Sequence, residues 1–594
     1  MQHDGAYCTL PQPLLMPRAK SLLTAILVFT GACATGTSVA PSAPPPDPNA
    51  GVASTTGLVV AQSSIAADVG AAVLTKGGNA VDAAVGTAFA LAVTHPSAGN
   101  IGGGGFMIVT PVRGEPVAID YRERAPLAAT PTMYLGADGN INRQLTARGY
   151  LAPGVPGTVR GLELAHKKFG KLPWQDVVMP AVELAERGFA MSATLARSLN
   201  GELTRNMTPF PASVAAYGKP GGGEWAAGDT LRLADLGKTL RAIATDGADV
   251  FYRGWIADLV ERDMKANGGL ITKVDLAAYE AKERRPVRGT FRGYEIISMP
   301  PPSSGGTALV QALNIVEQFD LRSMGRYSAE ASHVLIEARR RVFLDRARHL
   351  GDADFVTVPV EQLTSKDYAR QLAKGIDRTK AASSAELGRD IVTTVAQESE
   401  ETTHFSVIDR DGMAVSNTYT IEGGYGSHVV VAGAGFLLNN EMGDFNKKPG
   451  ETNLTGDIGT PANVIVGGKR MLSSMTPTIV TRNGRVVLVT GSPGGRTIIN
   501  TVLDVVLNVT EFGMNAREAV AAPRMDHQWL PDRVTVEHSG VSDADLERLR
   551  AMGHTVRIGA GQGDAHTIFV DLRTGIAYGA NDARSGDSKV SVAR

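Results

Sequence analysis

The stretch EETTHFSVIDRDGMAVSNTYTI, residues 400–421, places two adjacent threonines at the start of a strong β-hairpin signal. Two apolar runs flank an Asp-Gly pair, a dipeptide favoured in the tight turns that join antiparallel strands. Side chains alternate between the two faces of a strand, so Thr402 and Thr403 point to opposite sides. The stretch therefore predicts a β-hairpin that begins at a threonine pair.

The threonine pair raises the question of a nucleophile. A threonine hydroxyl attacks a carbonyl group only when a base accepts its proton. His404 shares a side with Thr402, but residues two apart on a strand are separated by about 6.5–7 Å, too far for a direct hydrogen bond. A chain cut before the threonine would instead free an α-amine, with a pKa of about 8, within one residue of the hydroxyl. The residues alone leave open which threonine this would be.

Further patterns along the chain indicate stacked α/β layers. Small-residue helices are predicted over residues 64–93, and residues 155–290 are mainly helical. Residues 328–376 are also helical, and the run Arg339–Arg341 is interpreted as a salt-bridged helix face rather than a ligand site. After residue 402, three more segments alternate strands with Asn-Gly or Thr-Gly turns. Helices before a β-rich final third predict an α/β layered fold.

Charge and cysteine content exclude several classes of protein. The 594 residues contain 59 Lys+Arg and 60 Asp+Glu, a formal net charge of -1, so nucleic acid is not an expected partner. The two cysteines, Cys8 and Cys33, lie in the first 33 residues, so the remainder has no disulfide or cysteine metal site. No His/Asp/Glu spacing favours a metal, and no cofactor is expected.

The N-terminus is typical of an exported protein. A basic segment begins at Met16, which we interpret as the alternative true start, and a short apolar run ends in Gly-Ala-Cys at Cys33. Residues 1–33 are predicted to be a signal peptide with a lipobox, and Cys33 to be lipidated; cleavage nearby by an ordinary signal peptidase is the alternative. Residues 34–56 are predicted to form a Pro-rich disordered tether. We expect a bacterial periplasmic protein, anchored to a membrane by lipid at Cys33.

Several ordered motifs together resemble one family. The second half contains ETTHFSVIDRDGMAVSNTYT, GFLLNNEMGDF, RMLSSMTPT and GSPGGRTI, and the first half contains GGNAVDAAV, IGGGGFMIV, YRERAP, APGVPGTVRG and MPPPSSGG. In this order and spacing they are similar to the γ-glutamyltransferases (γ-glutamyltranspeptidases) of the N-terminal nucleophile (Ntn) hydrolase superfamily. The resemblance spans residues 57–594. It implies an αββα sandwich, with two stacked, mainly antiparallel sheets between helical layers.

The resemblance also implies that the chain cuts itself. The expected cut is the Glu401–Thr402 bond, which divides the chain into a large-subunit segment, 57–401, and a small-subunit segment, 402–594. The two fragments are expected to stay together as a heterodimer.

The resemblance assigns catalytic roles that the residues alone left open. Thr402 is implied as the nucleophile and Thr403 as its structural neighbour. Thr420 is implied as a second threonine that hydrogen-bonds the nucleophile. Gly494 and Gly495 match the backbone N–H pair of an oxyanion hole, where the lack of a side chain lets a tetrahedral oxyanion approach.

Recognition of the substrate is implied at its α-amino-acid end. Arg122, Ser473 and Ser474 match a clamp for the α-carboxylate, which suits a planar guanidinium and two hydroxyls. Glu441 and Asp444 match the residues that hold the α-ammonium group. Glu422 stands where the family often has Asn, and this departure adds a carboxylate beside the ammonium site.

The implied reaction is transfer of the γ-glutamyl group of glutathione or related amides, through a γ-glutamyl ester on Thr402, to water or to an amino acid or peptide amine. Two alternatives remain. One is a glutaryl (cephalosporin-type) acylase of the same superfamily, in which Glu422, Glu441 and Asp444 would have no cation to bind. The other is a catalytically silent surface-binding lipoprotein of the same fold.

Overall fold

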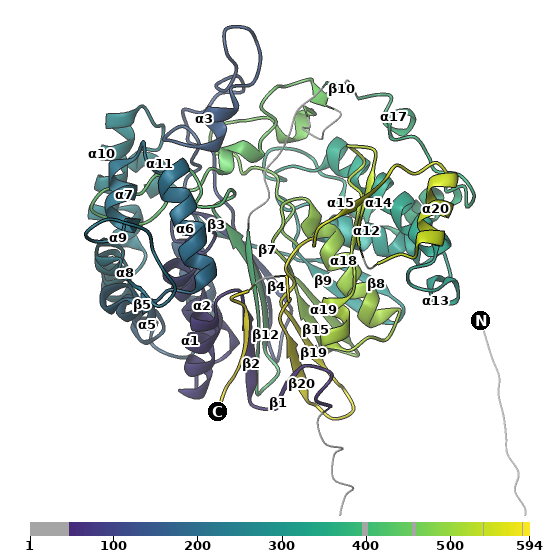
Figure 1. Cartoon of the computed structure of the whole chain (residues 1–594), viewed down its shortest axis with the longest axis horizontal. Coiled ribbons are helices and arrows are strands. Elements are labelled where there is room, and N and C mark those ends of the chain that lie inside the picture. The colour runs from purple at the N-terminus through teal and green to yellow at the C-terminus, as the bar shows by residue number, and fades with distance from the viewer. Residues whose placement is uncertain (1–46, 392, 395–401, 454–458, 539, 585) are drawn as a thin grey trace, which may run out of the picture. The chain divides into compact units, whose positions relative to one another are not determined.

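The predicted hairpin forms and becomes the middle of a seven-stranded sheet (Figure 1). The computed structural model describes residues 47–391, 393–394, 402–453, 459–538, 540–584 and 586–594. We call this sheet the nucleophile sheet, and every pair of neighbouring strands in it is antiparallel. Its order is β21 (Lys589–Val592), β2 (Gly57–Ala61), β11 (Thr403–Asp409), β12 (Ala414–Thr420), β3 (Gly104–Thr110), β4 (Val117–Tyr121) and β7 (Lys282–Arg284).

A second seven-stranded sheet, also antiparallel throughout, packs against the first. Its order is β1 (Val52–Ser54), β20 (Ala577–Ala580), β19 (Thr567–Val570), β15 (Arg485–Thr490), β14 (Thr478–Arg482), β9 (Tyr294–Ser298) and β8 (Val287–Phe291). Strands on both sides of residue 402 enter each sheet, so the two predicted segments are interleaved in one structural unit. Two stacked antiparallel sheets between helices confirm the predicted αββα class.

Helical layers cover the outer faces of the two sheets (Figure 1). On the nucleophile sheet lie α1 (Ser64–Thr75), α2 (Ala80–Thr94) and α4 (Thr158–Phe169), extended by α5 (Trp174–Arg187), α6 (Ala193–Arg205), α7 (Pro211–Tyr217), α8 (Ala234–Asp246), α9 (Asp249–Tyr252), α10 (Trp255–Asn267) and α11 (Lys273–Ala277). On the second sheet lie α12 (Gly305–Val316) and α18 (Thr497–Thr510), extended by α13 (Leu321–Met324), α14 (Ala329–His349), α15 (Val360–Leu363), α16 (Lys366–Lys374), α17 (Ser384–Leu387), α19 (Ala516–Ala521) and α20 (Asp543–Ala551).

Shorter elements complete the described chain. They are α3 (Arg143–Ala147), the 3-10 turns η1 (Glu441–Asp444) and η2 (Pro461–Asn463), the pair β5 (Phe189–Ala190) and β6 (Thr230–Leu231), the pair β10 (Thr393–Thr394) and β13 (Thr452–Asn453), and a small sheet of β16 (Met525–Asp526), β17 (Val534–Glu537) and β18 (Val556–Gly559).

Strand alternation explains how one sheet serves two cores. In β11, Phe405 and Val407 join the core beneath the helices, whereas Ile408 joins the core that contains the second sheet. A sheet that is packed on both faces must carry apolar side chains on both faces. Because side chains alternate along a strand, every second residue belongs to the same core. Counting back from Ile408, His404 and Thr402 point between the sheets, and Thr403 points to the helices.

One predicted boundary is wrong. Residues 34–56 were expected to be tether, yet β1 lies inside that range and pairs with β20. Ala50 is buried, so apolar contacts and strand pairing order the chain before residue 57. The predicted signal peptide and Cys33 lie outside the described residues.

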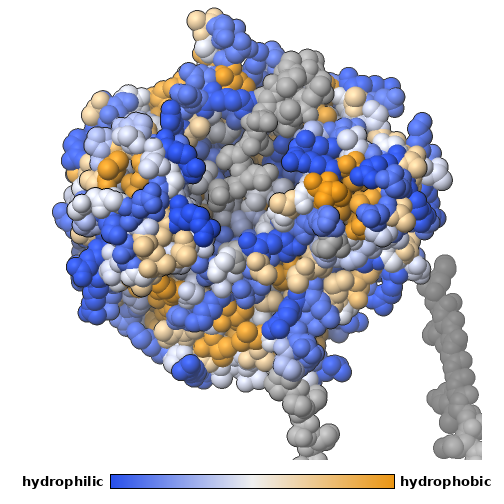
Figure 2. Space-filling view, viewed as in Figure 1, coloured by the Kyte–Doolittle hydropathy of each residue, from blue (hydrophilic) through white to orange (hydrophobic). Residues whose placement is uncertain are grey.

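The surface carries few large exposed apolar side chains, including Val112, Leu127 and Val274 among the described residues. In Figure 2, hydrophilic residues surround separate hydrophobic patches on the face shown. Within the described part of the chain, no helix has the length and apolar character needed to cross a bilayer.

Candidate active site

Thr402 lies directly before β11, and only 5% of its surface is exposed. The register pairs Thr403 with Tyr419, and one further step places Thr402 opposite Thr420, the last residue of β12. Both threonines fall on the inter-sheet side by strand alternation. The Thr420 hydroxyl oxygen accepts a hydrogen bond from the Glu422 N–H at 2.7 Å. The fold therefore brings the two predicted threonines together; Glu401 lies outside the described residues.

His404 is occupied elsewhere. Its Nδ1 lies 2.8 Å from the Thr418 hydroxyl and its Nε2 lies 3.1 Å from the Ser406 hydroxyl. The ring is fully buried, and burial lowers its pKa well below the usual value. A neutral imidazole bonded to two other hydroxyls fills the space between the sheets. This agrees with the inference from strand spacing that His404 is not the base for Thr402.

The predicted oxyanion glycines form the turn between β15 and α18. Gly494 has φ 125° and Gly495 has φ 54°, backbone conformations that favour glycine. The Gly494 carbonyl accepts the Thr497 N–H at 3.0 Å and the Thr497 hydroxyl at 2.7 Å, which fixes the turn on the first residue of α18. N–H groups at a helix N-terminus suit a developing negative charge.

Gly494→Ala is expected to reduce kcat about 100-fold or more, because a Cβ would lie 2.5 Å from the Thr497 hydroxyl oxygen and would turn the N–H away from an oxyanion. The measurement is the steady-state rate per cut chain. Gly484→Ala is the matched control: it also has positive φ, 73°, but its added Cβ meets nothing within 4 Å. If the Gly494→Ala enzyme kept the wild-type kcat, this turn would have no role in catalysis.

The substrate residues predicted from the sequence converge on Arg122. Its guanidinium lies 2.6 Å from a Glu441 oxygen and 2.5 Å from an Asp444 oxygen. Arg122 and Glu441 are essentially fully buried, whereas the Asp444 side chain is 30% exposed. The proposed carboxylate clamp and ammonium clamp thus contact each other directly. The turn η1 produces this arrangement, because Glu441 and Asp444 are its first and last residues.

Burial and charge set the ionisation of this cluster. Burial raises the pKa of Glu441 strongly, and the neighbouring carboxylates of Glu123, Asp444 and Glu422 raise it further against the effect of Arg122. Burial also raises the pKa of Glu123. Burial opposes the charge on Arg122, but its carboxylate neighbours outweigh burial and raise the guanidinium pKa. The cluster therefore holds one permanent cation beside two buried acids, Glu441 and Glu123, whose pKa values are raised.

Ser473 and Ser474 lie beside the same cluster. Arg122 donates to the carbonyls of Met471 and Leu472, the two residues before them, at 3.3 and 3.4 Å. The serine pair also meets the PPSS loop that starts α12: the Ser473 carbonyl accepts the Ser304 N–H at 2.8 Å. All three members of the predicted carboxylate clamp are therefore close in space.

The loop after β12 joins the nucleophile to this cluster. The Ile421 carbonyl accepts the Asn440 N–H at 3.1 Å, and the Asn440 amide oxygen accepts the Gly423 N–H at 2.8 Å. Glu422, half-buried with φ 73°, sits between these contacts. Its carboxylate is near enough to raise the pKa of Glu441. Glu422 therefore lies close to the ammonium site, as the sequence predicted.

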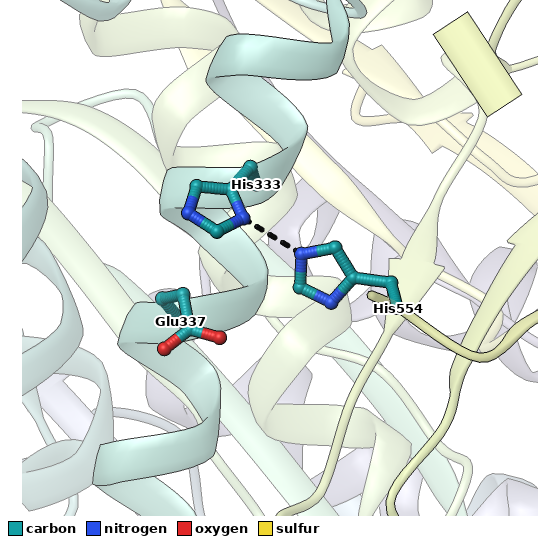
Figure 3. Close-up of side chains that lie close together, drawn as sticks. All are labelled: His333, Glu337 and His554. Carbon is teal, nitrogen blue, oxygen red and sulfur yellow. Dashed lines mark hydrogen bonds between the residues drawn. The ribbon is translucent and has the colours of Figure 1, made fainter. Parts of the chain in front are cut away.

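The sequence reasoning missed one buried cluster outside this site (Figure 3). His333 and Glu337, one turn apart on α14, meet His554, which precedes β18. His333 Nδ1 lies 2.7 Å from His554 Nε2, and His333 Nε2 lies 2.7 Å from the Asp377 carbonyl oxygen. The Glu337 carboxylate accepts bonds from Arg340, Arg341 and the Ala382 N–H.

Those contacts explain the cluster without a metal ion. The two rings bond each other, and two guanidinium groups neutralise the carboxylate, so a divalent cation would add positive charge where two are already present. The i, i+4 spacing of His333 and Glu337 was the signal available in the sequence, but His554 is 217 residues beyond Glu337 by numbering. The contact joins the two predicted fragments.

Acid is expected to destabilise this contact. Burial, with smaller effects from His333 and nearby Arg340, lowers the pKa of His554 to about 3. The folded-state pKa lies below the unfolded value of about 6.5, so the stability contribution is complete above pH 6.5 and is lost as pH falls towards 3. At pH 5 the loss is about 2 kcal/mol. The measurement is the thermal midpoint at pH 7.5 and 5.0, at fixed protein concentration. His554→Gln should lose less stability over this interval; an equal loss would contradict the assignment.

Comparisons with known proteins agree with this geometry. The family model described as Gamma-glutamyltranspeptidase matches residues 66–592. The Glutathione hydrolase proenzyme of Escherichia coli (strain K12) is 47% identical over 531 residues, covering 89% of this chain and 91% of that protein.

Two solved structures are also similar. A cephalosporin acylase from Bacillus halodurans superposes with a TM-score of 0.79 at 27% identity, covering 93% of this chain and 98% of that one. The γ-glutamyltranspeptidase of Helicobacter pylori gives a TM-score of 0.53 at 47% identity, covering 54% of this chain and 91% of that one. The chain belongs to the γ-glutamyltranspeptidase family.

Proposed function

We propose that this chain is a self-cleaving γ-glutamyltransferase that also hydrolyses γ-glutamyl amides such as glutathione. The observation that carries the proposal is the placement of Thr402 opposite Thr420, connected by one loop to the buried cluster of Arg122, Glu441 and Asp444. This arrangement combines a nucleophile with groups for both charges on the α-carbon of a glutamyl group. The name of the Escherichia coli relative, a glutathione hydrolase proenzyme, supports the same reaction.

Maturation begins with Thr402 attacking the chain itself. Its Oγ adds to the carbonyl carbon of Glu401, the peptide C–N bond breaks, and the leaving nitrogen takes the proton to become the Thr402 α-amine. Water then hydrolyses the resulting ester, which leaves a carboxylate on Glu401 and restores the hydroxyl. The products are fragments 1–401, before any removal of the leader, and 402–594.

In turnover, the free α-amine accepts the hydroxyl proton as Thr402 Oγ attacks the γ-carbonyl carbon. The N–H groups of Gly494 and Gly495 stabilise the oxyanion. Collapse of the tetrahedral intermediate breaks the amide bond, and the α-ammonium returns the proton to the leaving amine. Water or an acceptor amine then attacks the γ-glutamyl ester, loses a proton to the α-amine and releases Thr402, which predicts ping-pong kinetics.

The substrate would bind by exchanging ion pairs. Without substrate, Arg122 contacts Glu441 and Asp444. The α-carboxylate of a glutamyl substrate, bound also by Ser473 and Ser474, would form an ion pair with Arg122. The α-ammonium group of the same substrate would pair with Glu441 and Asp444. Charge is conserved in the exchange, so no isolated buried ion forms.

The acylase reading is the second candidate, favoured by the superposition on a cephalosporin acylase. A glutaryl group has the carboxylate but no ammonium, so Glu422, Glu441 and Asp444 would remain without a cation. γ-Glutamyl and glutaryl p-nitroanilides should therefore differ in kcat/KM by at least 10-fold in favour of γ-glutamyl. Faster release from the glutaryl compound would reverse the assignment.

N-terminal sequencing of the small fragment tests the central claim. A start at Thr402, together with two bands on a denaturing gel, is the expected result. A start at Thr403 would move the nucleophile. A single uncut band with no amidase activity would instead favour a silent binding lipoprotein.

We also propose that the protein is exported and anchored through a lipid on Cys33. The basic segment from Met16, the apolar run and the Gly-Ala-Cys ending support this. Cys33→Ser should release the protein from the membrane fraction while the small fragment still starts at Thr402. Unchanged membrane association would contradict the anchor.

A further inference from the structure

Arg346, in the last turn of α14, reaches two serine hydroxyls from inside the protein. Its Nε donates to the Ser304 hydroxyl oxygen at 2.9 Å, and one of its terminal nitrogens donates to the Ser474 hydroxyl oxygen at 2.9 Å. Arg346 and Ser474 are each 8% exposed, and Ser304 is fully buried. A buried guanidinium thus supports one of the two serines proposed to bind the substrate carboxylate.

The Ser304 contact extends to the other serine. The Ser304 hydroxyl accepts from Arg346 and donates to the Ser473 carbonyl at 2.6 Å, and the Ser304 N–H donates to the same carbonyl. The Ser473 N–H in turn donates to the Pro302 carbonyl at 3.0 Å. Arg346 therefore contacts the Ser474 side chain directly and the Ser473 backbone through the Ser304 hydroxyl.

Arg122 approaches the same segment through different atoms. It contacts the carbonyls of Met471 and Leu472 and the carboxylates of Glu441 and Asp444, whereas Arg346 contacts Ser304 and Ser474. The serine pair consequently has one arginine beside its preceding residues and a second bonded to its own hydroxyl.

We propose that Arg346 is a positioning residue for recognition of the substrate's α-carboxylate. A serine hydroxyl has one proton and two lone pairs. Because Arg346 donates to the Ser474 oxygen, the Ser474 proton must point away from the guanidinium and is available to the carboxylate. The bond also polarises the hydroxyl, which strengthens the donation. The inference rests on the proposed function, since it requires that Ser473 and Ser474 bind that carboxylate.

The contact links the two predicted fragments, since Arg346 lies before Glu401 and Ser474 lies after it. The carboxylate site is therefore complete only when the fragments are assembled around this guanidinium. Two other arginines of α14 contact different segments: Arg339 pairs with Asp504, and Arg348 pairs with Asp390. Asp504 lies in α18 and Asp390 follows α17, so these two pairs join α14 to other segments than the one that contains Ser474.

Three substrates separate this role from a general structural one. L-γ-Glutamyl p-nitroanilide carries both α-substituents, glutaryl p-nitroanilide lacks only the ammonium, and 4-aminobutyryl p-nitroanilide lacks only the carboxylate. Arg346→Gln is expected to lower kcat/KM about 10- to 100-fold for the two compounds with a carboxylate, mainly through KM. For 4-aminobutyryl p-nitroanilide the change should stay within about 3-fold.

Two further variants sharpen the test. Arg348→Gln, two residues along the same helix, should leave all three substrates unchanged. Ser474→Ala should reproduce the selectivity of Arg346→Gln, and the double variant should be no worse than Ser474→Ala for the carboxylate compounds, because the two residues act through one hydroxyl. Each rate is divided by the concentration of cleaved chain. If Arg346→Gln fails to cleave itself, the three substrates are compared with Arg346→Lys and Ser474→Ala instead.

Equal losses for all three substrates, or additive losses in the double variant, would overturn the inference. The proposed function fails separately: a wild-type enzyme with no preference for the γ-glutamyl compound would reject it before any variant is compared. A wild-type enzyme with that preference, together with a non-selective Arg346→Gln, would reject only the role of Arg346.

Discussion

Thr402→Ala yields one uncut chain with no measurable release of p-nitroaniline from L-γ-glutamyl p-nitroanilide, a loss of at least about 10⁴-fold. One substitution removes both the hydroxyl that cuts the chain and the nucleophile of turnover. The measurements are a denaturing gel and the steady-state rate. Thr402→Ser should retain slow cutting, because it keeps a hydroxyl on the same carbon.

Thr403→Val is the matched control for this prediction. Thr403 is buried on the helix side of β11, and its hydroxyl oxygen has no hydrogen-bond partner among the described residues. Valine has nearly the same shape and removes an unsatisfied polar atom, so cutting and activity should stay near wild type. An inactive Thr403→Val with an active Thr402→Ala would transfer the role of nucleophile to Thr403.

Arg122→Met is expected to lower kcat/KM by about 10³-fold or more and to destabilise the folded protein by about 3–5 kcal/mol. The guanidinium is buried against Glu441 and Asp444, so its removal leaves two carboxylates facing each other. Loss of the guanidinium charge, which lowers the pKa of Glu441, would raise that pKa further and leave the carboxyl protonated, which weakens the ammonium site as well. The measurements are kcat/KM and the thermal midpoint.

Arg124→Met provides the comparison for Arg122. Arg124 is partly exposed, and its guanidinium donates to the carbonyls of Gly468 and Ala278. It should leave kcat/KM within about 3-fold of wild type. If Arg122→Met lost stability but kept kcat/KM, the cluster would be structural and the substrate carboxylate would bind elsewhere.

The hairpin and the presence of stacked α/β layers could be predicted from local patterns, whereas the αββα arrangement was implied by the family resemblance. The Asp-Gly turn and the alternating residues after Thr403 determine a hairpin whatever surrounds it. The tether boundary was wrong because β1 has only three residues, and its order comes from pairing with β20, more than 500 residues later. The residues next to β1 in the sequence give no sign of a partner strand that lies so far along the chain.

For the run Arg339–Arg341, the sequence predicted the ion pairing but not the burial. Its pairing with acids was predicted, and Glu337 and Asp504 provide partners. The run was interpreted as a helix face, but all three arginines are at most 6% exposed. A sequence with many charges on a helix does not reveal that other helices and loops cover them.

The sequence by itself determined that a threonine pair opens a β-hairpin, that His404 is too far along the strand to be a simple base, and that ordered motifs resemble one family. These conclusions depend on strand period and on residues close in the chain. Only the tertiary structure decided that Thr402 faces the space between the sheets and Thr403 the helices. It also decided that Arg122 meets Glu441 and Asp444, and that Arg346 supports Ser474, because those contacts join residues more than 100 positions apart through packing of separate elements.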